Sequence, residues 1–242
     1  MANELRTLIA ANWKMHGDLG WAEKPASFQA VYPAVDRKHL DVLICPPATL
    51  LAVMAGTCKT AGIKLGGQDV HAKASGAHTG QISAEMLVDA GATYVIVGHS
   101  ECRAAGDTDA EVHAKADAAK RAGLTPIICV GETLEQREAG DAERVVREQI
   151  AASVPELDEY VIAYEPVWAI GTGKVATPDD VAAMHDAIRA QVGAGVRLLY
   201  GGSVKPANAK GLLALENVNG ALIGGAGLEM DSLAAIARMA PE

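Results

Sequence analysis

Short runs of apolar residues recur along the chain, and longer stretches with helical spacing lie between them. Most of these runs are continuous and do not alternate between apolar and polar residues, as is typical of parallel strands that are buried on both faces. The pattern predicts eight strands. Their apolar centres are residues 8–10, 42–44, 63–65, 95–97, 127–130, 161–163, 198–199 and 221–223.

Helical periodicity is clearest in four of the intervening stretches, residues 109–122, 132–152, 178–191 and 232–239. Thr177 followed by Pro178 is a good start signal, because threonine caps a helix N-terminus and proline suits the first turn. Regular alternation of strand and helix indicates an α/β protein with parallel strands and right-handed crossovers. Eight such units favour a closed (β/α)₈ barrel, and a doubly wound open sheet is the alternative. With no linker or compositional break, we expect a single domain over residues 1–242.

Composition narrows the choice of partners and compartment. Half of the 242 residues are hydrophobic, which is enough for a large core, and the net charge is −9. Without a basic run, nucleic acid and anionic membranes are not expected as partners. No apolar stretch approaches about 20 residues, so no membrane span is expected. The polar N-terminus shows no secretory pattern. The four cysteines lack metal-site or redox spacing, which favours a cytoplasmic protein with reduced thiols.

The segment from Tyr164 to Lys174 is the most informative part of the chain. Glu165 ends an apolar strand, and an apolar stretch leads from it to Gly171 and Gly173. A carboxylate shielded from water is a stronger base toward a carbon acid. Glycines bring backbone N–H groups close to an anion. The segment therefore predicts a general base followed by a lid that also binds phosphate.

Two other chemically active side chains also follow predicted strands. In a barrel of this kind, the residues just past the C-terminal ends of the strands form the working face. Lys14 and His99 stand at such ends, and with Glu165 they come from three different strands toward one centre. No group of histidines or carboxylates has metal-ligand spacing, so neither a metal nor another cofactor is expected.

Three familiar motifs are incomplete in this sequence. Gly173-Lys174 lacks the first glycine of a P-loop, and the segment from Gly98 to Cys102 ends in cysteine where a nucleophile elbow has glycine. The segment from Gly224 to Gly227 lacks the dinucleotide fingerprint. Glycines at the ends of the seventh and eighth predicted strands suit a phosphate monoester better, because phosphate sites recur there in (β/α)₈ barrels.

Four motifs together resemble the triosephosphate isomerase family over the whole chain. They are residues 12–14 (NWK), 98–101 (GHSE), 164–173 (YEPVWAIGTG) and 200–204 (YGGSV). The third is highly specific. The resemblance implies a single TIM barrel that interconverts dihydroxyacetone phosphate and glyceraldehyde 3-phosphate through an enediolate. It also implies a triose phosphate as the small-molecule partner.

The resemblance also implies roles for individual residues. Glu165 would move the carbon-bound proton, and a neutral His99, at the start of a helix formed by Ser100 and Glu101, would shuttle a proton between the carbonyl oxygens. Lys14 and Asn12 would stabilise the oxyanion, with Glu101 paired to Lys14.

Further roles concern the lid and the phosphate. Ile170 and Leu228 would form an apolar clamp over the base. The backbone N–H groups that would hold the phosphate belong to Gly171, Ser203, Gly224 and Gly225.

The same resemblance implies a homodimer. Residues 77–81 match the family's interdigitating loop, so Thr79 would reach the neighbouring subunit's site. Gln81 and Cys102 stand where family members usually have Glu and Arg, which commonly form a salt bridge between subunits. Their neutral replacement puts the strength of the dimer in doubt but leaves the reaction intact.

Two alternatives from the residues remain open at this point. One is another sugar-phosphate barrel enzyme, such as an aldolase that uses Lys14 as a Schiff base, which would need a buried, neutral lysine. The other is a catalytically silent binding scaffold. Loss of Glu165, His99 or Lys14 would be its natural signature, and all three are present.

Overall fold

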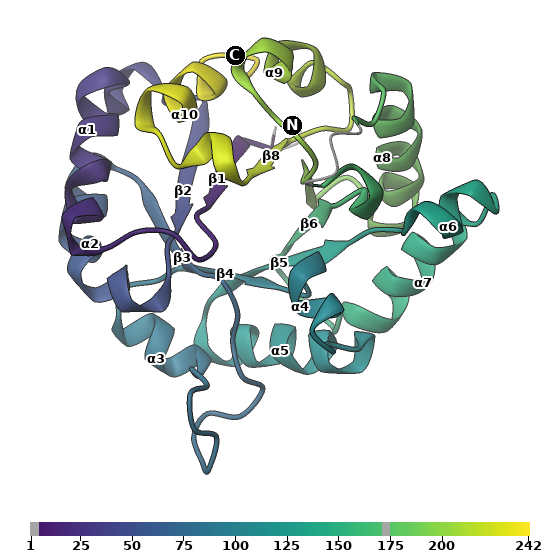
Figure 1. Ribbon diagram of the computed structural model, residues 1–242, viewed down its shortest axis with the longest axis horizontal. Helices are drawn as coiled ribbons and strands as arrows, with labels where there is room; N and C mark the ends of the chain where they lie inside the picture. The colour runs from purple at the N-terminus through teal and green to yellow at the C-terminus, as the bar shows by residue number, and fades with distance from the viewer. Residues whose placement is uncertain (1–4, 171–174) are drawn as a thin grey trace.

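The computed structural model describes residues 5–170 and 175–242, and their strands close into a barrel surrounded by helices (Figure 1). Each strand pairs in parallel with the next along the chain, and β8 pairs with β1 to complete the ring. The predicted closed (β/α)₈ barrel is therefore confirmed and the open sheet is wrong. The strands are β1 (Thr7–Asn12), β2 (Leu40–Cys45), β3 (Lys64–Gly67), β4 (Tyr94–Val97), β5 (Thr125–Val130), β6 (Val161–Tyr164), β7 (Arg197–Tyr200) and β8 (Gly220–Ile223).

The helices form the outer layer of the barrel (Figure 1). In the described residues, four short 3₁₀ turns supplement the α-helices: η1 (Leu19–Glu23), η2 (Ala34–Asp36), η3 (Val167–Ala169) and η4 (Gly225–Gly227). The α-helices are α1 (Lys24–Val31), α2 (Ala48–Ala61), α3 (Ala84–Asp89), α4 (Ser100–Ala104), α5 (Asp109–Ala122), α6 (Leu134–Glu138), α7 (Ala142–Ser153), α8 (Pro178–Val192), α9 (Pro206–Leu213) and α10 (Met230–Ala237).

Three of the four predicted helices are present with small differences at their ends. The prediction for residues 109–122 has the bounds of α5, α8 ends one residue later than predicted, and α10 begins and ends two residues earlier. The single helix predicted over residues 132–152 is wrong. It divides into α6 and α7 at Gly140, whose φ of +79° is a left-handed conformation that an α-helix cannot contain.

Apolar side chains form two separate cores, one inside the ring of strands and one between the strands and the helices. The inner core draws alternate residues from neighbouring strands, as side chains in a strand point to opposite faces. Its members are Leu8, Ala10, Leu43, Cys45, Tyr94, Ile96, Ile127, Cys129, Val161, Ala163, Leu199 and Leu222.

The same alternation carries polar side chains to the open end of the ring. In β1 the inward residues Leu8 and Ala10 are followed by Asn12, and in β6 Val161 and Ala163 are followed by Glu165. The hydrophobic pattern that buries the strands thus also aims two polar groups at the mouth of the barrel.

One loop projects well beyond the barrel. It joins β3 to α3 over residues 68–83 and extends away from the ring of helices (Figure 1). In the part of the chain that the structure describes, no helix combines the length and apolar character needed to cross a membrane.

Candidate active site

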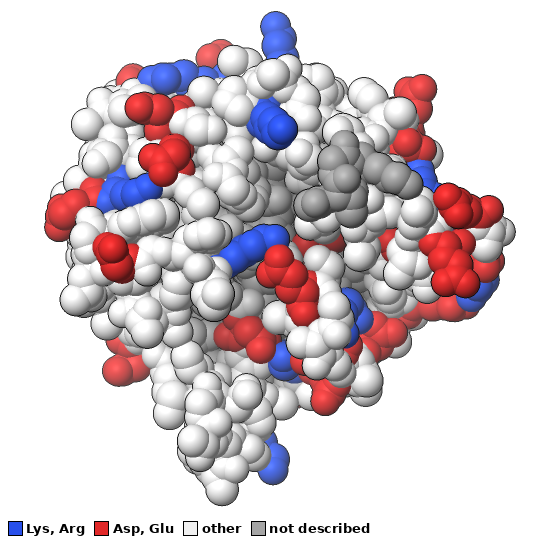
Figure 2. Space-filling model, viewed as in Figure 1, with Lys and Arg blue, Asp and Glu red and all other residues white. Residues whose placement is uncertain are grey.

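A cavity of about 380 Å³ opens at the C-terminal ends of the strands. Figure 2 shows a hollow in this face, with basic and acidic side chains interspersed around it and no continuous basic area. Residues of β1 and β8, together with residues that follow β1, β4, β6, β7 and β8, form its walls. The lining residues are Asn12, Lys14, His99, Glu101, Glu165, Ala169, Ile170, Gly201, Gly202, Ser203, Val204, Lys205, Leu222, Gly224, Gly225 and Ala226.

Glu165 lies at the floor of this cavity, and its side chain is almost completely buried. Its Oε2 accepts a hydrogen bond from the backbone N–H of Ser100 at 2.9 Å, and Oε1 lies 3.4 Å from the Ser100 hydroxyl. Oε1 is also 3.0 Å from Nε2 of His99. The carboxylate is therefore removed from bulk water but supplied with hydrogen-bond donors, as a buried charged group requires.

His99 caps the N-terminus of α4, so its ring is oriented by the helix that the sequence predicted at Ser100 and Glu101. Its Nδ1 accepts the backbone N–H of Glu101 at 3.2 Å, which requires a lone pair on Nδ1. In the neutral ring the proton then sits on Nε2, the nitrogen that faces Glu165. The imidazole can donate one hydrogen bond into the cavity.

Lys14 adopts a φ of +52°, in the left-handed region that side chains other than glycine rarely enter. Two hydrogen bonds hold this conformation. The side-chain oxygen of Asn12 accepts the N–H of Lys14 at 2.9 Å, and Nε2 of Gln68 donates to the Lys14 carbonyl at 2.8 Å. Strain of this kind is concentrated at functional sites, where surrounding contacts maintain it.

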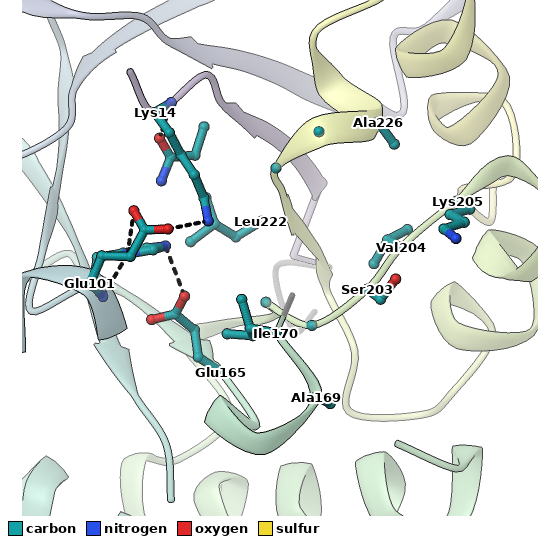
Figure 3. Close-up of a pocket in the computed structure, with 16 residues that line it drawn as sticks. Lys14, Glu101, Glu165, Ala169, Ile170, Ser203, Val204, Lys205, Leu222 and Ala226 are labelled. Atoms are coloured by element: carbon teal, nitrogen blue, oxygen red, sulfur yellow. Dashed lines mark hydrogen bonds and ion pairs between the residues drawn. The ribbon is translucent and has the colours of Figure 1, made fainter. Parts of the chain in front are cut away.

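The predicted ion pair between Lys14 and Glu101 is present, with Nζ 2.6 Å from Oε1 (Figure 3). Partial burial works against the charge of Glu101, but the hydrogen bond and the charge of Lys14 outweigh it. The pKa of Glu101 accordingly lies below its ordinary value. Above that pKa the carboxylate orients the ammonium group at the edge of the cavity.

The opposite wall of the cavity consists mainly of glycines and short side chains (Figure 3). Ser203 follows β7, and Gly224 and Gly225 follow β8 at the start of η4. A Cβ atom at Gly224 would lie 3.6 Å from Cε of Lys14, so this wall faces the cation across the cavity. An anionic group held by these backbone N–H groups would also be close to Lys14.

Of the residues predicted for the lid and its clamp, one lines the cavity and one does not. Ile170 lines the cavity beside Glu165 (Figure 3). Leu228 is half-buried against the outer core and does not belong to the described residues that line the cavity. Gly171 lies outside the residues that the structure describes.

Glu132, which sequence reasoning missed, is completely buried at the base of the segment that leads to Ile170. Its Oε1 accepts hydrogen bonds from the Tyr164 hydroxyl at 3.1 Å, from Nε1 of Trp168 at 2.7 Å and from Arg137 at 3.0 Å. The backbone carbonyl of Glu132 accepts the N–H of Val167 at 3.2 Å. The signal in the sequence was a carboxylate two residues after the apolar run of β5.

Gln68 and two glycines also escaped the sequence analysis. Gln68 bridges the carbonyls of Lys14 and Cys45 at 2.8 and 2.9 Å, and it directly follows the two glycines that end β3. Gly131 and Gly201 approach Glu165 so closely that an added Cβ would lie 1.7 Å from its carbonyl oxygen and 2.8 Å from its Cγ, respectively. These glycines make the space that Glu165 occupies.

The three residues predicted at a subunit contact lie outside the cavity wall. Thr79 and Gln81 are exposed on the projecting loop, and Cys102 is half-buried on α4. Burial raises the pKa of the Cys102 thiol to about 11, and Asp69 adds to the effect, so this cysteine is a poor nucleophile at neutral pH.

One group among the described residues has donor atoms close enough for a metal ion: Asp69, Cys102 and Asp107. Nζ of Lys115 already lies 2.8 Å from Asp69 and 2.7 Å from Asp107, so a cationic group neutralises both carboxylates. The group lies apart from the residues that line the cavity and gives no support to a metal-dependent reaction there.

Comparisons with known proteins all lead to one family. The family model described as triosephosphate isomerase matches residues 7–240. The chain is 53% identical to a triosephosphate isomerase of Afipia carboxidovorans, over 100% of both chains. It is 51% identical to that of Hyphomonas neptunium, over 98% of this chain and 99% of the relative.

A similar solved structure is the crystal structure of triosephosphate isomerase from Bartonella henselae. It superposes with a TM-score of 0.88 at 43% sequence identity, covering 97% of this chain and 98% of the other. At this identity the likeness extends beyond the fold.

Proposed function

From the premise that the chain belongs to the triosephosphate isomerase family, we propose that Glu165, His99, Lys14 and Asn12 carry its reaction. The enzyme interconverts dihydroxyacetone phosphate and D-glyceraldehyde 3-phosphate, a step of glycolysis and gluconeogenesis. The reaction moves one proton between neighbouring carbons through an enediolate. The contact that carries the proposal is the 3.0 Å approach of Nε2 of His99 to Oε1 of Glu165, in the cavity that Lys14 also enters.

Glu165 acts as the general base. It removes the proton from the substrate carbon and returns it to the adjacent carbon. To reach the substrate, its carboxylate gives up the hydrogen bond from the backbone N–H of Ser100 and turns toward the centre of the cavity. General base catalysis of this kind supplies roughly 10²–10⁴-fold in rate, so other groups must contribute.

His99 and Lys14 supply the electrostatic contribution. The Nε2–H of His99 donates to the substrate's carbonyl oxygen and then shuttles a proton between the two oxygens of the enediolate. The ammonium of Lys14, oriented by Glu101, stabilises the developing oxyanion together with the side chain of Asn12. One preorganised donor of this kind is worth about 10²–10³-fold. A glutamate base paired with a neutral histidine is the established description of this family.

The phosphate occupies the glycine-rich side of the cavity. The backbone N–H groups of Ser203, Gly224 and Gly225 hold it, with Gly171 as a further donor predicted outside the described residues. Binding energy at this remote group holds the reacting carbons next to Glu165. No cofactor takes part in the proposed mechanism.

Ile170 and Leu228 form an apolar clamp over Glu165 in the closed enzyme. The position of Ile170 beside the base supports this role, whereas the side chain of Leu228 has to turn toward the cavity from its place against the outer core while its backbone stays in place. Exclusion of water by the clamp protects the enediolate from loss of phosphate.

The decisive experiment is a coupled assay that compares the wild type with Glu165→Ala. We expect turnover to fall by about 10²–10⁴-fold with inorganic phosphate still binding, because the phosphate site does not include this side chain. Glu138→Ala, an exposed glutamate on α6, serves as the matched control and should retain full activity. A Glu165→Ala variant as active as the control would overturn the proposed mechanism.

A Schiff-base aldolase is the rejected alternative. Nζ of Lys14 forms an ion pair with Glu101 at 2.6 Å, whereas imine formation needs a neutral amine. Borohydride reduction in the presence of dihydroxyacetone phosphate should therefore leave Lys14 unmodified.

The functional unit is a homodimer, with each active site completed near the contact between subunits. Large apolar side chains support such a contact: Met15 beside Lys14 is 95% exposed, and Met86 on α3 is 55% exposed. The projecting loop with Thr79 and Gln81 would enter the partner. Because Gln81 and Cys102 carry no charge, the dimer should depend weakly on salt at this contact. Sedimentation showing a monomer at micromolar concentration would refute the dimer.

The chain forms one domain over residues 1–242 and works in the cytoplasm. The pairing of β1 with β8 in a single ring supports the domain assignment. The four cysteines, none of which forms a disulfide bond, support the compartment.

A further inference from the structure

Lys24 is the first residue of α1, and its side chain reaches across to the loop after β8. Its Nζ donates a hydrogen bond to the backbone carbonyl of Leu228 at 2.5 Å. The same ammonium lies 3.7 Å from the centroid of the Trp21 ring and 3.3 Å from Oε1 of Glu229. With 19% of its side chain exposed, Lys24 is mostly sheltered from solvent.

The indole beneath this ammonium is itself fixed to the other side of the active site. Trp21 packs edge-on against Trp13, with ring centroids 5.3 Å apart and planes at 76°. Trp13 is completely buried and stands between Asn12 and Lys14. Two aromatic rings and one lysine therefore connect the end of β1, which holds the oxyanion-stabilising groups, to the loop after β8.

The loop that Lys24 contacts has few side chains of its own to hold it. Residues 224–227 are Gly-Gly-Ala-Gly, and a Cβ at Gly225 would meet no atom within 4 Å. Gly227 is in close contact with β1, since its Cβ would lie 2.9 Å from that of Ala11. Glycine-rich backbone has many accessible conformations, so a firm attachment at its far end reduces the entropy lost when it binds an anion.

We propose that Lys24 is a positioning residue that holds the loop of residues 224–228 in the shape that binds the substrate's phosphate. The inference rests on the phosphate site described under Proposed function. Lys24 acts through the Leu228 carbonyl and does not touch the substrate. Because the phosphate is held alike in the ground state and the transition state, Lys24 affects KM much more than kcat.

A competing explanation is that Lys24 attracts the phosphate by its charge alone. Glu229 separates the two possibilities, because its carboxylate lies beside the same ammonium but is 77% exposed. If Lys24 acts through its charge, Glu229→Gln should strengthen phosphate binding, because it removes a neighbouring negative charge. If Lys24 acts through its hydrogen bond to the Leu228 carbonyl, Glu229→Gln should leave phosphate binding unchanged.

The experiment measures steady-state kinetics and the competitive inhibition constant of inorganic phosphate. For Lys24→Met we expect the inhibition constant and KM to rise together by roughly fivefold, with kcat within about twofold of the wild type. Lys24→Arg keeps a donor for the Leu228 carbonyl, so its inhibition constant and KM should both match those of the wild type. Lys120→Met is the matched control, since Nζ of Lys120 also donates to a backbone carbonyl, that of Glu156 at 2.6 Å, on the outside of the barrel. It should leave all three constants unchanged.

Three results would overturn the role of Lys24. The first is an unchanged inhibition constant in Lys24→Met, and the second is an equal effect in Lys120→Met. The third is tighter phosphate binding in Glu229→Gln, which would favour the field explanation. If Lys24→Met does not fold, Trp21→Leu is used in its place, because it removes the ring beneath the ammonium. We expect this variant to bind phosphate about twofold more weakly. Unchanged phosphate binding would count against the proposal. If inorganic phosphate does not compete with substrate even in the wild type, the phosphate site itself is wrong.

Discussion

The position of Glu165 depends on two residues that have no side chain. Gly131 and Gly201 come from the strands on either side of β6, and each leaves room for a different part of Glu165. The approach at Gly131 involves the backbone of Glu165, which cannot rotate away as a side chain could. The position of Glu165 is therefore determined by the neighbouring strands as much as by its own strand.

We predict that Gly131→Ala lowers stability by about 2–3 kcal/mol and turnover by about 10²-fold or more. The added methyl group would overlap the Glu165 carbonyl, and a shift of about 1 Å in a catalytic group is enough for such a loss. Urea unfolding and the coupled assay measure the two effects. Gly211→Ala in α9 is the matched control, because no atom lies within 4 Å of its Cβ. There alanine should stabilise the helix by about 0.5–1 kcal/mol. Wild-type behaviour of Gly131→Ala would contradict the steric argument.

At the scale of single residues, the sequence predicted which side chains share a cavity when each of them stands just past the end of a strand. Lys14, His99 and Glu165 each follow an apolar run, and the barrel brings them into one cavity. It failed for Gln68, Gly131 and Gly201, because their importance lies in contacts with residues of other strands. The distance from Gly131 to Glu165 exists only once β5 and β6 are in register.

At the scale of elements, the chain between β6 and Ile170 is anchored by one buried acid. Glu132 receives the side chains of Tyr164 and Trp168, and its carbonyl receives the N–H of Val167. Arg137 joins Glu132 to Asp180 near the start of α8, so both sides of the segment that follows Ile170 share a network. These contacts attach residues 164–168 to the end of β5.

Ile170→Ala should lower turnover by about tenfold and change the binding of a phosphate-bearing inhibitor much less. The side chain shields Glu165 from water but does not hold the phosphate, so its loss affects the reacting end of the substrate. Steady-state rates and inhibitor titration separate the two effects. Val175→Ala, at an exposed position in the same region of the sequence, is the control. Equal losses in turnover and inhibitor affinity would exclude the clamp.

The observed starts of helices match the predicted ones where the sequence has strong capping signals. Thr108 and Thr177 each form a capping box at the start of α5 and α8, and both helices begin where the sequence predicted. The stretch 132–152 kept helical periodicity across Gly140, so the pattern alone did not reveal the break between α6 and α7. Periodicity reports which faces are apolar but does not report the backbone conformation of one glycine.

At the scale of the whole molecule, one buried histidine links stability to pH. His185 on α8 is completely buried, with Nδ1 2.9 Å from the carbonyl of Asn217 and its ring edge-on to Tyr164. Burial lowers its pKa to about 4. The unfolded chain binds a proton at this residue below about pH 6.5, whereas the folded protein does not until about pH 4.

The free energy of unfolding should therefore fall as the pH drops from 7 to 4, with about 3 kcal/mol of the loss due to His185. Urea unfolding at several pH values measures the slope. His185→Gln should show a shallower slope than the wild type, and His113→Gln, at an exposed position on α5, should follow the wild type. Parallel curves for His185→Gln and the wild type would exclude this role.

The overall architecture was the most predictable feature, because eight buried parallel strands in strict alternation with helices have few ways to pack. Closure itself could not be derived from any single segment. It depends on β1 meeting β8, where Gly220 has a φ of +142° and a Cβ would lie 1.9 Å from the carbonyl oxygen of Leu8.

This seam has a consequence for synthesis on the ribosome. β1 cannot pair with β8 until residue 220 has been synthesised. At about 5–20 residues per second, this occurs roughly 10–40 s after β1 itself is made. During that interval the growing sheet has unpaired edges at both sides, which favour association between nascent chains. Pairing of β8 with β1 removes both edges at once, so the last strand to be made is the one that ends this exposure.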